Sequence, residues 1–332
     1  MAVTRPASTR SQQSNLILDA LILTPDSAPL SRDIADYPEG IVIPIDKPYR
    51  WTSADVIRKV KFAAIRHFGK KNLKVGHAGT LDPLATGVLL VCIGKATKLA
   101  EELQSHDKEY VAGITFGATT PSYDLEKEID RFFPHEHITS EAVTKALPAF
   151  IGEQDQIAPL FSAKSVDGVR AYELARRLYK TMEGNDSDKS QSIEKPADFD
   201  EAAKDLIRVS RITISGLELM EFKGVEKTGF ESRTSLTTSS TPEEQCISKA
   251  SARINVTDNS ALGLPRALVR MACSKGTYVR AFARDLGEAL DTGAHLDSLQ
   301  RSRSGIFRVE NALTVDQAIS LLNNGAQHAA HQ

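Results

Sequence analysis

The chain has 332 residues, of which 41% are hydrophobic and 25% charged, and its formal net charge is −2 at pH 7. This composition is typical of a globular protein, and no apolar run approaches the roughly 20 residues that a membrane-spanning helix needs. The three cysteines, Cys92, Cys246 and Cys273, form no CxxC pair, so the sequence predicts neither a structural zinc site nor disulfides and favours a cytoplasmic location.

The small net charge hides an uneven distribution along the chain. Residues 46–110 hold 12 Lys and Arg against 7 Asp and Glu, a local charge of +5, and residues 264–308 hold 8 against 4, a local charge of +4. Residues 181–263 hold 10 against 15, a local charge of −5. Two basic regions around an acidic one are compatible with a nucleic-acid partner. They are also compatible with ordinary variation over a globular surface.

The first 36 residues combine a Ser/Thr/Gln-rich tract with a short apolar patch, and we expect a flexible N-terminal arm there rather than a secretory signal. Residues 40–48 predict a strand. Thr52 and Asp55 then predict the capped start of a helix that ends at Gly69. The exposed side of this helix and its exit loop carry basic residues at positions 59, 61, 66, 70, 71 and 74.

Residues 76–87, GHAGTLDPLATG, contain too many glycines and prolines to predict a helix or a regular strand. Asp82 is the only side chain in this predicted loop that we expect to act as a nucleophile or a base. A loop of small residues between buried elements is a favourable place for an active site. An Asp-Pro pair between glycines is equally an ordinary turn signal, and the spacing alone does not decide between the two.

The rest of the chain mixes strands and helices without regular βαβ alternation, which favours an α+β fold over a doubly wound sheet. Polar insertions are predicted near residues 181–205 and 223–250. We expect one catalytic domain over residues 37–320 and a C-terminal tail at residues 321–332. Strands are predicted at residues 88–93, 110–116, 206–214, 252–256 and 267–273, and helices at residues 140–150 and 278–290.

Three other functional motifs are incomplete or absent in this sequence. Gly94-Lys95 lacks the glycine that a phosphate-binding P-loop needs five residues earlier, where Leu89 stands. His135 and His137 have no further ligand at metal-site spacing, and the chain has no Gly-x-Ser-x-Gly elbow. We therefore expect no metal and no cofactor.

Six sequence blocks remain, in the order DKP with WTS, KVGHAGTLDPLATGVLLVCIGKATK, DKEY, FSAKSVDGVRAYELAR, CSKGTYVRAFARDLG and GAHLDSLQRSRSGIF. In content, order and spacing they closely resemble the TruB family of tRNA pseudouridine-55 synthases. The resemblance implies the α+β pseudouridine-synthase fold, with a mixed, largely antiparallel sheet and the catalytic cleft across it. It also implies an isomerase that converts the T-loop uridine of tRNA to pseudouridine.

The resemblance further implies roles for single residues. Asp82 matches the family's catalytic aspartate. Tyr110 matches the tyrosine that stacks on the target uracil, and Tyr278 lines the same pocket. Arg280 matches the arginine that pairs with the catalytic acid. The sequence does not choose between attack of Asp82 on the sugar and removal of a sugar proton by Asp82.

Two further substrate-binding residues follow from the same resemblance. His77 matches the histidine that meets the substrate loop as the uridine is turned out, and Lys47 matches the lysine of the DKP block beside the site. The reaction breaks the C1′–N1 bond, turns the uracil and joins C5 to C1′. It includes no net redox change, which agrees with the expectation that no cofactor is needed.

The chain departs from the family pattern at several positions. Ala158 replaces the first residue of a usual Pro-Pro pair, Ser165 stands where lysine is usual, and Ala78 replaces a threonine. Loop contacts by the segment around Ser165 are therefore in doubt. Only 25 residues follow Phe307, so we expect no RNA-binding PUA domain.

The expected partner is the T-arm stem-loop of tRNA, with no membrane and no obligate protein partner. Three alternatives are a non-catalytic RNA-folding protein, the same chemistry guided to another RNA, and a structural scaffold for tRNA. A pure binder would not need the Asp82 carboxylate beside phosphates. The guided branch usually carries the PUA domain that we do not expect here.

Overall fold

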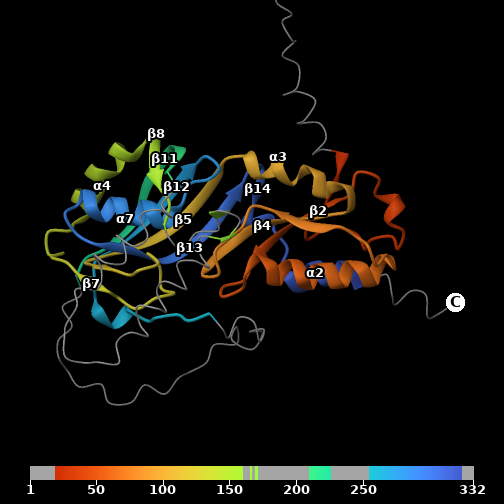
Figure 1. Ribbon diagram of the computed structural model, residues 1–332, viewed down its shortest axis with the longest axis horizontal. Helices are drawn as coiled ribbons and strands as arrows, with labels where there is room; N and C mark the ends of the chain where they lie inside the picture. Colours follow the sequence, from red (N-terminus) through yellow and green to blue (C-terminus); the bar gives the residue numbers. More distant parts are fainter. Residues whose placement is uncertain (1–18, 160–164, 167–168, 171–208, 226–253, 324–332) are drawn as a thin grey trace, which may run out of the picture. The chain divides into compact units, whose positions relative to one another are not determined.

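A computed structural model of the protein describes residues 19–159, 165–166, 169–170, 209–225 and 254–323 (Figure 1). The chain divides into two compact units. Of the described residues, unit 1 contains 19–110, 254 and 299–323, and unit 2 contains the other described residues between 111 and 298. Two of the points at which the chain leaves one unit for the other fall inside strands β5 (Lys108–Phe116) and β13 (Ala294–Ser304).

The strands of unit 1 follow the order β1-β2-β4-β13, with β3 also on β4 and β14 on β13. Strand β4 is antiparallel to β2 and β3 and parallel to the end of β13, where Arg301 lies opposite Gly87. The bounds are β1 (Leu21–Ile22), β2 (Ile41–Lys47), β3 (Val75–Ala78), β4 (Ala85–Ile93) and β14 (Phe307–Arg308).

Both faces of this part of the sheet are covered, which explains the continuous apolar run at the end of β4. Val88, Leu90 and Cys92 belong to one buried cluster with Leu103 of α3. Helices α2 and α8 pack against each other and contact strands β2 to β4, and Figure 1 shows α2 and α3 on opposite sides of β4. The helices are α2 (Ser53–Phe68), α3 (Ala100–Ser105) and α8 (Val315–Asn323), with 3-10 turns η1 (Ile34–Asp36), η2 (Gly94–Leu99) and η8 (Val309–Asn311).

The local signals at the start of the chain are confirmed where they concern helix ends. Thr52 and Asp55 form a complete capping box on α2, and Gly69, with φ of 62°, ends the helix. The flexible arm predicted over residues 1–36 is wrong for its described part, because β1 pairs with β2 and Leu23 is fully buried. Leu322 of α8 is also fully buried, so the predicted tail begins too early.

In unit 2 the strand order is β13-β5-β12-β11-β8, and β11 is antiparallel to both β12 and β8. Helix α7 (Val279–Ala289) buries Phe282, whose ring meets that of Phe150 edge-on at 5.4 Å between centroids. The other elements are β6 (Ala118–Thr119), β7 (Arg131–Phe132), α4 (Ser140–Ala146), η3 (Leu147–Phe150), β8 (Gly152–Ile157), β9 (Ser165–Val166), β10 (Val169–Arg170), β11 (Val209–Lys223), η7 (Ser260–Leu262) and β12 (Arg266–Cys273).

The predicted α+β class and the mixed, largely antiparallel sheet are confirmed, since β1–β2 and β4–β13 are parallel and the pairs of β4 with β2 and of β11 with β12 and β8 are antiparallel. The strand predicted at residues 206–214 extends to Lys223. Register shifts beside Gly216 and Glu221 interrupt the alternation that would have indicated its second half.

The strand predicted at residues 252–256 is wrong in its described part, because residues 254–256 form no strand. The predicted insertion at 181–205 and most of that at 223–250 lie outside the described residues. Among the helices that the structure describes, none is long and apolar enough to span a membrane.

Candidate active site

The loop that carries Asp82 is shorter than the sequence predicts. Residues 76–78 belong to β3 and residues 85–87 to β4, so the absence of regular strand predicted for 76–87 is wrong at both ends. Pairing with neighbouring strands forms regular strand at both ends, despite the low strand preference of the glycines. At Gly87, where φ is 95°, an added Cβ would lie 2.3 Å from the carbonyl oxygen of Arg301, so the close approach of β13 requires glycine. Residues 79–84 form the loop itself.

The centre of the loop is a turn that presents Asp82. The amide of Ala85 donates to the carbonyl oxygen of Asp82 at 3.1 Å, and Pro83 occupies the second position of the resulting four-residue turn. Proline favours that position because its φ is already that of the turn. The Asp82 side chain is partly exposed. The interpretation of the Asp-Pro pair as a turn is thus confirmed, and Asp82 within that turn is a partly exposed residue.

Ser53, the first residue of α2, fixes the residue before Asp82. The amide of Leu81 donates to Ser53 Oγ at 2.9 Å, and Ser53 Oγ donates to the carbonyl oxygen of Leu81 at 3.2 Å. Both residues are buried. Since a capping box fixes the start of α2, these two hydrogen bonds hold the loop to a rigid helix end.

Lys47 fixes the residue after Asp82. Its side chain is fully buried, and Nζ donates to the carbonyl oxygens of Pro48 at 2.9 Å, Trp51 at 2.5 Å and Pro83 at 3.1 Å. These three acceptors match the three N–H groups of an ammonium. Burial lowers the pKa of Lys47 to about 7, and the negative charge of Asp82 opposes that shift. The charge of Asp82 therefore acts on the pKa of Lys47, while the hydrogen bonds of Lys47 go to backbone carbonyl oxygens.

Arg301 of β13 is a buried group that sequence reasoning missed. It is 2% exposed, and its Nε donates to the carbonyl oxygen of Val88 at 2.7 Å. Its Nη2 and Nη1 lie 3.3 and 3.5 Å from the carbonyl oxygens of Gly79 and Thr80. One guanidinium thus reaches the start of the loop and the strand that follows it. In the sequence Arg301 is one of the two arginines of the block GAHLDSLQRSRSGIF, and no local pattern distinguishes it from Arg303.

The other two predicted residues of unit 1 lie on strands. His77 is on β3, opposite Val91 of β4, and is partly exposed. Tyr110 is on β5 and is 9% exposed. Unit 1 therefore carries four of the six predicted site residues. Cys92 lies nearby on β4, where burial raises its pKa to about 12, so this thiol is not a nucleophile.

Unit 2 carries Tyr278 and Arg280 at the start of α7. Tyr278 is the N-cap residue and is partly exposed. The buried amide of Gln156 holds its backbone from both sides: the Tyr278 amide donates to Gln156 Oε1 at 2.8 Å, and Gln156 Nε2 donates to the Tyr278 carbonyl oxygen at 3.1 Å. Gln156 thus accepts from the backbone N–H of the N-cap residue, as the N3 side chain does in a capping box.

Arg280 is held by the turn that follows β6. It is 5% exposed, its Nη1 donates to the carbonyl oxygen of Ser122 at 3.1 Å, and its Nε lies 3.8 Å from Asp124 Oδ2. Asp124 also accepts from Ser122 Oγ at 2.6 Å and from the amide of Glu126 at 3.0 Å. Sequence reasoning missed Asp124, although a buried arginine requires an anionic partner. The pairing of Arg280 with Asp82, which belongs to the other unit, stays a prediction.

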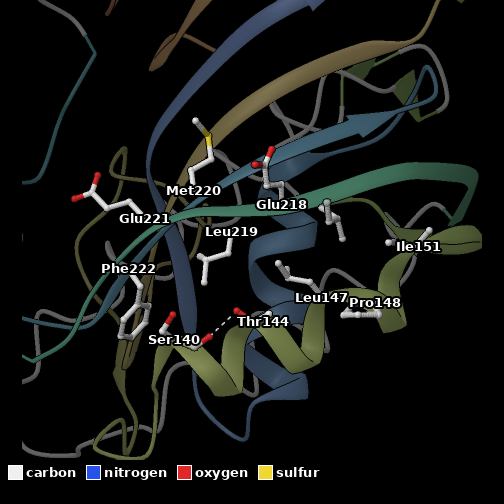
Figure 2. Close-up of a pocket in the computed structure, with 11 residues that line it drawn as sticks. Ser140, Thr144, Leu147, Pro148, Ile151, Glu218, Leu219, Met220, Glu221 and Phe222 are labelled. Carbon is white, nitrogen blue, oxygen red and sulfur yellow. Dashed lines mark hydrogen bonds between the residues drawn. The ribbon is translucent and has the colours of Figure 1, made fainter.

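A pocket of about 500 Å³ lies elsewhere in unit 2, between α4 with η3 and the second half of β11. Figure 2 shows Leu147 and Leu219 facing each other across it. None of the six predicted site residues lines it, and its charged residues are Glu218 and Glu221. Glu218 pairs with Arg270 and Glu221 with Lys223, and the described lining residues include no cation. Because RNA phosphates need cations, this pocket is not a candidate for the predicted substrate.

No cluster of three or more His, Cys, Asp or Glu residues able to hold a metal ion occurs within the described ranges. His135 and His137 instead have backbone partners: His135 Nδ1 lies 3.0 Å from the carbonyl oxygen of Phe133, and His137 Nε2 lies 2.8 Å from that of Leu290.

Comparison with known sequences points to a single family. The profile of the TruB family pseudouridylate synthase N-terminal domain matches residues 66–195. The chain is 44% identical over 281 residues to tRNA pseudouridine synthase B of Phocaeicola vulgatus, with 85% of this chain and 92% of that protein covered. The enzyme of the same name from Flavobacterium johnsoniae is 38% identical to this chain. That alignment covers 84% of this chain and 95% of the Flavobacterium protein.

Comparison with solved structures agrees on the fold. In the crystal structure of a Cbf5-Nop10-Gar1 complex, one chain aligns with a TM-score of 0.51 and 23% sequence identity. The alignment covers 92% of this chain and 61% of that chain. At this level of identity the likeness concerns the fold alone.

Proposed function

The chain belongs to the TruB family of pseudouridylate synthases, and on this premise we propose that Asp82 is the carboxylate with which it isomerises the T-loop uridine of tRNA to pseudouridine. As a tRNA pseudouridine synthase, the protein is an isomerase. Its substrate is tRNA. We further propose that it acts in the cytoplasm and that its catalytic domain includes α8.

The observation that supports Asp82 is the fixation of its neighbours on both sides. Leu81 is held by Ser53 and Pro83 by Lys47. Thr80 and Gly79 lie against the Arg301 guanidinium. A catalytic group must be held within about 0.5 Å of its productive position by its supporting residues. The loop holds its backbone in this way and leaves the carboxylate partly exposed.

An aspartate carboxylate is ionised at neutral pH and can act as a nucleophile or as a base. In the first course Asp82 attacks C1′ and the C1′–N1 electron pair goes to the uracil. In the second it removes a sugar proton and the same bond breaks. The uracil then turns and C5 joins C1′. In the first course this step breaks the Asp82–C1′ bond and frees the carboxylate, and in the second the abstracted proton returns to the sugar. In both courses C5 loses its proton and N1 gains one. Atoms and electrons balance without a co-reactant.

The target base must leave its stack before Asp82 can reach the sugar, which costs a few kcal/mol. We assign Tyr110 to stack on the turned-out uracil, which returns about 1–3 kcal/mol, and Tyr278 to line the same pocket. His77 contacts the substrate loop. A hairpin loop is already partly unstacked, which favours a folded T-arm over a linear strand.

Arg280 is assigned to the catalytic carboxylate by the family resemblance. The contacts around it support a positioning role for Asp124 and Ser122, which engage the guanidinium within unit 2. An arginine beside a carboxylate favours the ionised form of that carboxylate. Lys47 is assigned as a positioning residue for the turn rather than as a direct ligand of RNA, because its three donors contact backbone carbonyls.

The assignment of Asp82 is tested with Asp82→Asn on a purified T-arm transcript. We expect RNA binding close to that of the wild type and no pseudouridine. The matched control is Glu101→Gln, which changes an exposed acid on α3 of the same unit and should retain full turnover. Full turnover by Asp82→Asn would refute the role of this carboxylate.

A further inference from the structure

The exposed side of α2 carries a group that the reaction at Asp82 does not use. Phe62 is 71% exposed, while Val60, Ala63 and Ala64 of the same helix are buried. Arg58 and Arg66 lie four residues before and after it, which places them one helical turn away on the same side. Arg58, Lys59, Lys61 and Arg66 are all exposed. We name Phe62 with these four cations the Phe62 surface.

The Phe62 surface leads away from the catalytic loop. Ser53, the first residue of α2, contacts Leu81 directly beside Asp82. The 16 residues of α2 span about 24 Å at 1.5 Å per residue. An RNA that places one nucleotide at Asp82 therefore has further nucleotides within reach of this helix. The exposed Lys70 and Lys71 continue the positive charge beyond its end.

We propose that the Phe62 surface is a second RNA contact. The Phe62 ring stacks there on an unpaired nucleotide other than the one that binds at Asp82. This inference rests on the proposed function, because it takes the RNA bound at Asp82 as the ligand. Arg58 pairs with Asp55 at 2.9 Å, and Lys59 lies 5.2 Å from the centre of the Trp51 ring. Lys61 and Arg66 are therefore assigned to the phosphates beside the stacked base.

The composition of the surface favours RNA over a protein partner. Single-stranded RNA sites combine cations that follow the backbone with aromatic rings on which bases stack. The core of a protein interface is instead depleted in charged residues and apolar over a wider area. Exposed cations surround Phe62 at positions 58, 59, 61 and 66, so charge complementarity favours a polyanion as the ligand of this surface.

The test measures the dissociation constant of a T-arm stem-loop and of whole tRNA, together with the rate of pseudouridine formation at low and at saturating RNA. Phe62→Ala should weaken binding about thirtyfold, the middle of the range for one lost base stack. The loss of rate should be confined to low RNA concentration. Phe62→Trp should restore affinity, because the larger ring still stacks. Since Phe62 is exposed, neither change threatens folding.

Salt dependence separates the cations from the ring. Lys61→Ala and Arg66→Ala should each reduce the slope of log affinity against log salt by about 0.7 to 0.9, whereas Phe62→Ala should leave the slope unchanged. The matched control is Phe132→Ala, which removes a phenylalanine of similar exposure, 63%, from β7 of unit 2 and should leave affinity unchanged.

Equal affinities of the wild type and Phe62→Ala would overturn the inference, and so would an equal loss in Phe132→Ala. A protein partner at Phe62 would give the first of these results. Failure of the proposed function gives a different result, because the wild type itself would then form no pseudouridine in T-arm RNA.

Discussion

The Nζ atom of Lys47 lies 3.1 Å from the carbonyl oxygen of Pro83, the residue directly after Asp82. The same Nζ donates to the carbonyl oxygens of Pro48 and Trp51, in the segment that leads into α2. A buried ammonium therefore joins the start of a helix to the catalytic turn. A hydrogen-bonded group of this kind stabilises the fold and orders the site at once.

Lys47→Met should lower the free energy of unfolding by about 2–4 kcal/mol. Methionine fills a similar volume but removes the ammonium donor from three carbonyl oxygens, of which, among the described residues, only that of Pro48 keeps another donor, the Trp51 amide. Each hydrogen bond lost at a buried or part-buried oxygen costs about 1 kcal/mol or more. Urea unfolding of the two proteins at one pH measures the difference. An unchanged midpoint would contradict the role of these three hydrogen bonds.

The pH dependence of the same two proteins tests the ionisation of Lys47. Burial lowers its pKa from 10.5 to about 7 in the folded state. Between these values the unfolded chain binds more protons, so this group makes the wild type more stable as pH rises, by at most about 1.4 kcal/mol per pH unit. Below pH 7 both states are protonated and the contribution is constant. The stability difference between the wild type and Lys47→Met should therefore grow from pH 7 to 10, and a constant difference would contradict the shift.

The sequence predicts those parts of the site that depend on residues close to each other along the chain. The capping box of Thr52 and Asp55 and the turn at Asp82 depend on residues within three positions of each other. Arg301 contacts Val88 across 213 positions and Arg280 contacts Ser122 across 158. No local pattern encodes such contacts, so Arg301 and Asp124 emerge only from the fold.

The strand ends around the loop show the opposite failure, a local signal that the fold overrides. The glycines of residues 76–87 predict a loop throughout, yet Gly76 pairs with Cys92 and Gly87 lies opposite Arg301 in the sheet. At Gly87 the neighbouring backbone excludes any side chain. The same residue type that breaks an isolated strand is what allows this one to pack.

Gly87→Ala should destabilise the protein strongly, by about 3 kcal/mol or more. The new Cβ would lie within 2.8 Å of three backbone atoms of Arg301, and φ of 95° is strained for alanine. Gly76→Ala is the matched control, because a Cβ added at Gly76 would have no atom within 4 Å, so this change should alter stability little. Thermal unfolding of both variants decides the point, and equal melting temperatures would contradict the close approach.

Asp124→Ala should cost about 3–5 kcal/mol of stability, because it removes a buried carboxylate from beside the buried Arg280 guanidinium. The side chains of the pair are only 6% and 10% exposed. Glu153→Ala removes the carboxylate that pairs with Arg211. The two side chains of this pair are 69% and 61% exposed, so the change should alter stability little. A small effect of Asp124→Ala in denaturant unfolding would show that the buried Arg280 guanidinium is stabilised without the Asp124 carboxylate, for example by its hydrogen bond to Ser122.

Arg301→Met should slow pseudouridine formation at saturating RNA by about tenfold or more, with a smaller effect on RNA affinity. The substitution removes the donors near Gly79, Thr80 and Val88, so the turn that carries Asp82 loses its fixed position, and a misplacement of about 1 Å can cost a hundredfold in rate. Arg301→Lys should recover part of the rate, because one ammonium reaches fewer of these oxygens than a guanidinium. Arg303→Met, two residues along β13, removes a side chain that donates to Gly305 instead and should leave the rate near that of the wild type. Single-turnover rates are compared at a temperature where all variants are folded, and a wild-type rate in Arg301→Met would show that the loop holds Asp82 without this residue.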